Sequence, residues 1–110
     1  MKSRSGARAL AVALALAGAA ACGSGTGPAH HRVEIRGAEF RPDTVAVAVG
    51  DTVTWVNHDV VPHTVSAANG AWDSGAVAPG ESFVLVIDRA GAVRYVCAYH
   101  PTMVGVLAVR

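Results

Sequence analysis

Short β-rich segments separated by turn residues recur along most of the chain, and this pattern limits the fold more than any other feature of the sequence. Turn pairs stand at Gly50-Asp51, Asn69-Gly70 and Pro79-Gly80, and residues of these types favour chain reversals. The segments between the turns are rich in valine and threonine, and none has a convincing helical periodicity. The pattern predicts an all-β fold, an antiparallel sandwich or barrel of seven to eight strands. The expected strands lie at 33–35, 44–49, 52–57, 63–67, 82–88, 93–97 and 103–109.

The N-terminal segment has the composition of an export signal. Lys2, Arg4 and Arg8 precede an apolar run over 9–21, which has signal-peptide length and is too short for a transmembrane helix. We therefore expect a signal peptide at 1–21, a flexible tether at 22–31 and a single folded domain at 32–110.

Two ways of processing this signal are compatible with the residues around Cys22. Ala19-Ala20-Ala21 matches the A-x-A site of an ordinary signal peptidase. The same residues with Cys22 resemble a bacterial lipobox, although Ala19 stands where leucine is usual. The glycine- and serine-rich run after Cys22 suits a tether, so the lipoprotein is favoured. The expected location is the periplasm or the extracytoplasmic face of the cell membrane, with lipid on Cys22 as the only membrane contact.

The net charge argues against a nucleic-acid partner. The whole chain carries +1, but without Lys2, Arg4 and Arg8 six arginines face eight acidic residues, which gives −2. A slightly acidic domain without a basic stripe lacks the electrostatic pattern of nucleic-acid binding.

Three potential metal ligands lie within seven residues near the C-terminus. Cys97, His100 and Met103 form a C-x2-H-x2-M motif between two predicted strands. Cys97 is the only cysteine other than Cys22, and a free thiol in an oxidising compartment is vulnerable unless a metal occupies it. The strand period of two directs the thiol inward with Tyr95. A fourth donor must come from elsewhere, and His63 after Pro62 is the candidate.

The donor types indicate redox copper. Two imidazoles, one thiolate and a weak thioether suit both Cu(II) and Cu(I), whereas an iron–sulfur cluster usually requires four thiolates. Taken singly, each residue has an ordinary explanation: a buried cysteine or methionine is usually core, and a loop histidine is usually solvated.

The combined motifs resemble the plastocyanin/azurin family of cupredoxins, and the short ligand loop is most similar to the amicyanin branch. The resemblance covers residues 32–110. It is carried by 50–57, Pro62-His63, Asp73-Ser74-Gly75, 79–83 and the C-x2-H-x2-M loop.

This resemblance implies a Greek-key β-sandwich with one type 1 copper ion at one pole. His63, Cys97 and His100 would be equatorial ligands and Met103 the axial ligand. The family often has asparagine after the first histidine, where it ties the two ligand loops together. Thr64 stands there in this chain, and its hydroxyl could serve similarly.

The expected function is single-electron transfer rather than enzyme catalysis. The alternative is a copper-binding protein for delivery or storage, and an oxidase would need a second copper site or a substrate cavity. We expect a monomer whose redox partners dock transiently near His100. An uncharged apolar patch would surround that residue, formed by Val60, Val61, Pro62, Tyr99 and Pro101.

Other histidines and aromatic residues receive structural interpretations. His30 and His31 are assigned to the tether, and His58 and Asp59 to the loop before Pro62 as turn residues. Trp55 and Trp72 are expected to pack in the core and at its rim.

Overall fold

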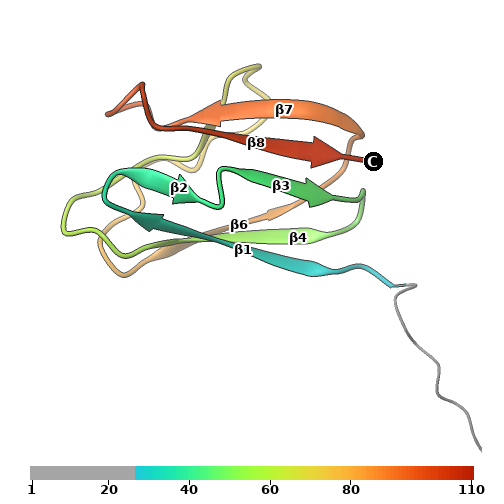
Figure 1. Cartoon of the computed structure of the whole chain (residues 1–110), viewed down its shortest axis with the longest axis horizontal. Coiled ribbons are helices and arrows are strands. Elements are labelled where there is room, and N and C mark those ends of the chain that lie inside the picture. Colours follow the sequence, from blue (N-terminus) through green and yellow to red (C-terminus); the bar gives the residue numbers. More distant parts are fainter. Residues whose placement is uncertain (1–26) are drawn as a thin grey trace, which may run out of the picture.

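The computed structural model describes residues 27–110, so the predicted signal peptide and Cys22 lie outside the described residues. This part of the chain contains no helix that could cross a membrane. It forms eight strands in two four-stranded sheets packed face to face (Figure 1). The strands are β1 (His30–Arg36), β2 (Glu39–Arg41), β3 (Thr44–Val47), β4 (Thr52–Asn57), β5 (Ser66–Ala67), β6 (Ser82–Val86), β7 (Gly91–Val96) and β8 (Val104–Val109).

The strand order confirms the predicted all-β sandwich. One sheet has the order β2-β1-β4-β6 and the other β3-β8-β7-β5. Four strand pairs are antiparallel, as predicted, whereas β1 pairs with β4 and β3 pairs with β8 in parallel. The chain crosses from one sheet to the other after β2 and back after β3, and such crossovers bring strands of the same direction side by side.

The core follows the strand period of two. On β4 the side chains of Val53, Trp55 and Asn57 are buried and those between them are not. Trp55 makes aromatic contacts with Tyr95 and Trp72, at ring-centroid distances of 5.4 Å and 5.7 Å. Packing between the two inner faces therefore stabilises the sandwich through apolar burial.

The N-terminal boundary differs from the prediction. Strand β1 begins at His30, inside the segment assigned to the tether. His31 Nε2 lies 2.8 Å from Asp51 Oδ2, and Asp51 also accepts bonds from the backbone N–H groups of Ala29 and Ala48. These contacts hold His31 in the fold, and His30 Nε2 lies 3.0 Å from Thr54 Oγ1. The composition of the local sequence does not reveal such long-range contacts.

The predicted strand over 63–67 is also shorter than expected. Only Ser66 and Ala67 form β5, whereas His63 makes an isolated bridge with Val77. Strand β2 was not predicted, because it has three residues and is followed by Pro42.

The two ends of the sandwich carry different segments of the chain. Strands β1 and β4 run toward one pole, where Ile35 pairs with Asn57, and β7 ends and β8 begins at the same pole. This ligand-loop pole, at the left of Figure 1, carries the connections 58–65 and 97–103, whereas the start of β1 lies at the opposite pole.

Candidate metal centre

Three of the four predicted ligands converge at the ligand-loop pole. His63 Nδ1 and His100 Nδ1 each lie 3.7 Å from Cys97 Sγ. The three donor atoms all lie within 4.8 Å of one another. Bonds of about 2.0 Å from imidazole nitrogen and about 2.3 Å from thiolate sulfur, typical of a first-row metal, would produce N–S separations of this size. The arrangement therefore fits a single ion between the three atoms.

Cys97, His100 and Met103 are brought together by two consecutive turns after β7. Cys97 follows Tyr95 on the inward face of the chain, and both side chains are buried. His100 N–H donates to Cys97 O, and Met103 N–H donates to His100 O at 2.8 Å. Cys97 N–H donates to Met103 O and closes the loop. Met103 is buried in the core cluster that contains Cys97, which places it at the inner side of the loop.

His63 reaches the same point from the connection after β4. The side chain of Asn57 is fully buried and organises this connection: it donates to Val61 O and Val77 O and accepts from Asp59 N–H. The backbone of His63 then bonds reciprocally with Val77. These bonds make the loop a defined structure, and the imidazole of His63 is completely buried.

Asp59 is a neighbour of the site that sequence reasoning missed. It was assigned to a turn, but its Oδ2 lies 2.9 Å from His63 Nε2. A carboxylate only accepts, so Nε2 carries the proton and Nδ1 keeps its lone pair toward Cys97. The only indication in the sequence was that Asp59 stands four residues before His63 in the same loop.

The same carboxylate holds the turn between β1 and β2. Asp59 Oδ1 accepts from Gly37 N–H at 2.7 Å, and Oδ2 accepts from Ala38 N–H at 2.8 Å. Burial by itself would raise the pKa of Asp59, but the bonds from Ala38, Gly37 and His63 outweigh it and lower the pKa below its ordinary value. Asp59 is therefore a charged link between His63 and a neighbouring turn.

Thr64 connects the two ligand loops, as its position predicted. Its backbone N–H donates to Cys97 Sγ at 3.3 Å. Its hydroxyl accepts from Ala98 N–H at 2.7 Å. Cys97 is free of disulfide bonding within the described part of the chain, so its sulfur is available to a metal.

The remaining histidines of the described residues take part in other contacts. His58 Nε2 lies 2.5 Å from Glu34 Oε1, and His30 contacts Thr54 on the face of β4. His58 lies in the loop after β4, as predicted, but the structure assigns no turn to it, and its side chain connects this loop to β1.

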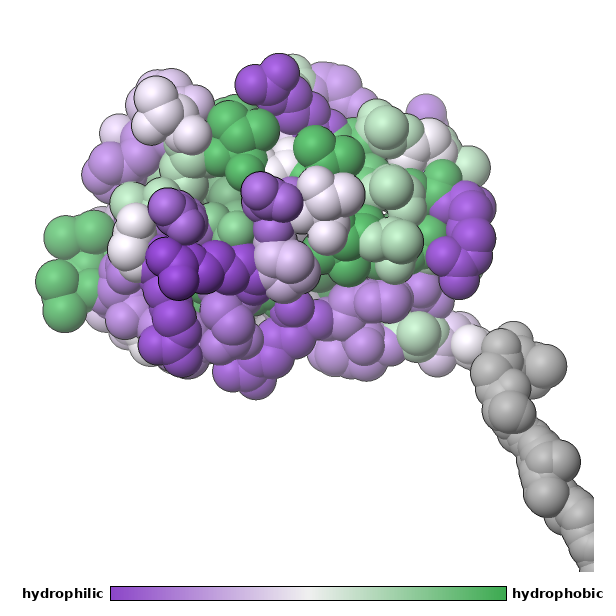
Figure 2. Space-filling view, in the orientation of Figure 1, coloured by the Kyte–Doolittle hydropathy of each residue, from purple (hydrophilic) through white to green (hydrophobic). Residues whose placement is uncertain are grey.

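The surface near His100 is apolar. His100 itself is exposed, and Val60, Val61 and Tyr99 have exposed fractions of 91%, 44% and 53%. Figure 2 shows hydrophobic surface projecting at the left end of the molecule, the ligand-loop pole. Pro62 and Pro101 are also exposed.

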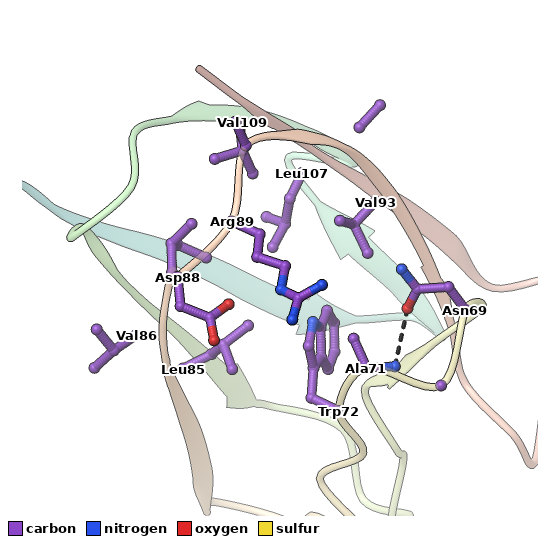
Figure 3. Close-up of a pocket in the computed structure, with 14 residues that line it drawn as sticks. Asn69, Ala71, Trp72, Leu85, Val86, Asp88, Arg89, Val93, Leu107 and Val109 are labelled. Atoms are coloured by element: carbon purple, nitrogen blue, oxygen red, sulfur yellow. Dashed lines mark hydrogen bonds between the residues drawn. The ribbon is translucent and has the colours of Figure 1, made fainter.

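A cavity of the described structure lies elsewhere. It has a volume of about 530 Å³ and is lined by 69–72, the end of β6, the following loop and parts of β7 and β8. Figure 3 shows Trp72 and Arg89 among its lining side chains. Trp55 is completely buried and Trp72 partly buried, which confirms their predicted core and rim positions. None of the four predicted ligands lines this cavity.

Comparisons with known proteins agree with this geometry. A family model described as copper binding proteins, plastocyanin/azurin family, matches residues 29–110. Amicyanin from Paracoccus denitrificans is 32% identical over 82 residues, which cover 70% of this chain and 63% of that protein. Plastocyanin from Scenedesmus fuscus is 36% identical over 72 residues, covering 56% and 74%. The chain thus spans slightly less than two thirds of the amicyanin.

Solved structures show the same likeness. A novel purple cupredoxin from Nitrosopumilus maritimus has a TM-score of 0.65 at 31% identity, covering 72% of this chain and 98% of that one. An oxidized mutant of amicyanin has a TM-score of 0.68 at 28% identity, covering 72% and 80%.

Proposed function

Because this chain belongs to the plastocyanin/azurin family of copper-binding proteins, we propose that it carries single electrons by means of one type 1 copper ion. His63, Cys97 and His100 would hold the ion as equatorial ligands, with Met103 as a weak axial ligand. Bound copper would supply the one-electron Cu(II)/Cu(I) couple. The observation that carries the proposal is the convergence of one thiolate and two imidazoles within 4.8 Å at one pole.

The surroundings of the donors suit an electron carrier because they restrict movement. Asp59 orients the ring of His63 through Nε2, and Thr64 bonds both to Cys97 Sγ and to Ala98 N–H. A site whose ligands stay in place changes little between oxidation states. Little reorganisation is then needed when an electron is gained or lost.

The exposed edge of His100 supports an electron route to the surface. His100 is the exposed member of the three converging residues, whereas His63 and Cys97 are fully buried. The apolar residues around it, Val60, Val61, Pro62, Tyr99 and Pro101, carry no charge. Such a surface suits brief docking of a redox partner protein over a small area.

Export and anchoring are also proposed, on the N-terminal sequence alone. The basic residues, the apolar run over 9–21 and the following Cys22 support secretion with lipid attached at Cys22. Mass measurement of the mature N-terminus tests this: a diacylglyceryl modification on Cys22 is expected, and an unmodified terminus at Cys22 would contradict the lipid anchor.

Copper titration of the apo-protein tests the proposed function. Cu(II) should give an intense visible band from thiolate-to-copper charge transfer that a mild reductant bleaches reversibly. Cys97→Ser should abolish the band, whereas His58→Ala, which removes a histidine outside the site, should retain it. A colourless wild type, or equal colour in Cys97→Ser, would refute the proposal.

Retention of the reduced ion separates a carrier from a delivery protein. A carrier should keep Cu(I) when a competing chelator is added, because it must cycle without losing the metal. Rapid loss of Cu(I) would instead support delivery or storage.

A further inference from the structure

A chain of side-chain hydrogen bonds extends from the ligand loop to the molecular surface. Ala98 N–H donates to Thr64 Oγ1 at 2.7 Å, and Thr64 Oγ1 lies 2.9 Å from Ser66 Oγ. Ser66 in turn donates to Asp73 Oδ1 at 3.1 Å. Asp73 is exposed, whereas Thr64 has an exposed fraction of only 4%. The chain therefore connects a surface carboxylate with the residue that follows Cys97.

The chemistry of its two ends determines the direction of every bond in this chain. A backbone N–H can only donate and a carboxylate can only accept, and each hydroxyl has one proton. Ser66 uses its proton on Asp73, so the Thr64 hydroxyl must donate to Ser66. The oxygen of Thr64 is then left to accept from Ala98 N–H. Asp73 thus sets the orientation of the Thr64 hydroxyl across two bonds.

The position of Asp73 is itself well defined. Its Oδ1 also accepts from Gly75 N–H at 2.9 Å, and its backbone forms an isolated bridge with Ser66. The adjoining Ser74 Oγ accepts from Val65 N–H at 2.7 Å, and Ser74 N–H donates to Val65 O. The segment 73–75 is therefore held against 65–66, and the acceptor stays in place.

We propose that Asp73, Ser66 and Thr64 act as a positioning chain that holds the Cys97 loop in register with the His63 loop and so sets the reduction potential. Thr64 is the common element, because its hydroxyl holds Ala98 and its backbone N–H donates to Cys97 Sγ. Hydrogen bonding at the cysteine sulfur is one of the factors that tune blue-copper potentials. The effect on the potential depends on the proposed copper site, whereas the restraint on Ala98 does not.

Paired variants of the full chain test the proposal. Ser66→Ala removes both bonds that Ser66 makes in the chain, and Asp73→Ala removes the bond from Ser66. Ser66→Thr retains a hydroxyl and Asp73→Asn retains an acceptor oxygen. The first readout is amide hydrogen exchange of Ala98 in the metal-free protein. Loss of the orienting bond should speed this exchange about fivefold, the factor expected from one ordinary hydrogen bond. The conservative variants should exchange at the wild-type rate.

The second readout is the midpoint potential of the copper-loaded protein. Ser66→Ala and Asp73→Ala should lower it, because a weakened N–H bond to Cys97 Sγ leaves more electron density on the thiolate and favours Cu(II). Ser66→Thr should stay at the wild-type value. Wild-type Ala98 exchange and wild-type potential in Ser66→Ala would overturn the proposal.

The two proposals fail in different ways. If wild-type protein binds no copper, the proposed function fails, but Ala98 exchange still tests the chain. If Ser66→Ala is blue and behaves as wild type in both readouts, the chain fails and the function stands. Thr64→Val, which keeps the shape of threonine without the hydroxyl, gives an independent variant should Ser66→Ala fold poorly; wild-type Ala98 exchange in Thr64→Val would equally refute the chain.

Discussion

Replacing Asp59 by alanine should weaken copper binding without removing any predicted ligand. Asp59 accepts from His63 Nε2 at 2.9 Å and from the N–H groups of Gly37 and Ala38. Without the carboxylate, the ring of His63 loses its bond to Asp59. That bond fixes the orientation of the ring and keeps the lone pair of Nδ1 directed toward Cys97. The Asp59→Ala protein must therefore order this ring when the metal binds.

The size of the effect follows from two separate losses. Removing the partner of a ligating histidine typically lowers metal affinity by about 10- to 100-fold, which corresponds to about 1.4–2.8 kcal/mol of binding free energy. The free energy of unfolding of the metal-free protein should also fall, by about 1–3 kcal/mol, because the buried ring N–H of His63 and two backbone N–H groups lose their acceptor.

Competition titration against a chelator of known copper affinity measures the first loss, and urea unfolding of the apo-protein measures the second. Asp88→Ala is the matched control, since Asp88 is an exposed carboxylate remote from the ligand-loop pole. An Asp59→Ala protein that binds copper within a factor of two of wild type would refute the reasoning, whatever its stability.

Three further perturbations have definite expected outcomes. Gly105→Ala should destabilise the fold by about 1–3 kcal/mol or more in urea unfolding, because the added Cβ would lie 2.2 Å from Cζ of the fully buried Tyr95; unchanged stability would contradict the tight packing of this pair. Asp51→Asn should flatten the acid dependence of stability: bonds from Ala29 N–H, His31 and Ala48 N–H lower the pKa of Asp51 from 3.8 to about 2. A carboxyl group with a lowered pKa stabilises the fold at pH values above its ordinary pKa, and this stabilisation is lost as the pH falls from about 4 toward 2. If Asp51→Asn had the same dependence of stability on acid pH as wild type, this contribution of Asp51 would be excluded. His100→Ala should slow electron self-exchange more than it disturbs folding, as measured by NMR line broadening in mixtures of the two oxidation states and by circular dichroism; an unchanged self-exchange rate would count against the surface route.

Local patterns in the sequence predict most of the strands and the motif of Cys97, His100 and Met103, but they do not predict which strands pair. The alternation at Val53 and Trp55 predicts β4, since the period of two identifies a strand with one buried face. The parallel pairing of β1 with β4 depends on where the chain crosses between sheets, and no local pattern encodes that choice. The same limit explains why His30 and His31 were assigned to a tether: their partners, Thr54 and Asp51, are 20 or more residues away.

The sequence likewise predicted some residues of the candidate site and not others. Cys97, His100 and Met103 are recognisable because their spacing is short and their chemistry is shared. Asp59 could not be identified from its type, because aspartate is common in loops and its contacts with Gly37 and Ala38 come from a different strand pair. The family resemblance predicted the role of Thr64, which follows His63, but its links to Ser66 and Asp73 required the folded structure.

The start of β1 at the pole opposite the ligand loops has a consequence for the proposed electron transfer. If lipid holds Cys22 in a bilayer, the residues from Cys22 to Ala29 can extend at most about 25 Å, so the domain stays close to the membrane by its N-terminal end. The exposed edge of His100 would then lie at the pole of the domain farther from the attachment. Under the proposed function, this placement would favour electron exchange with soluble proteins over exchange with a partner embedded in the same bilayer.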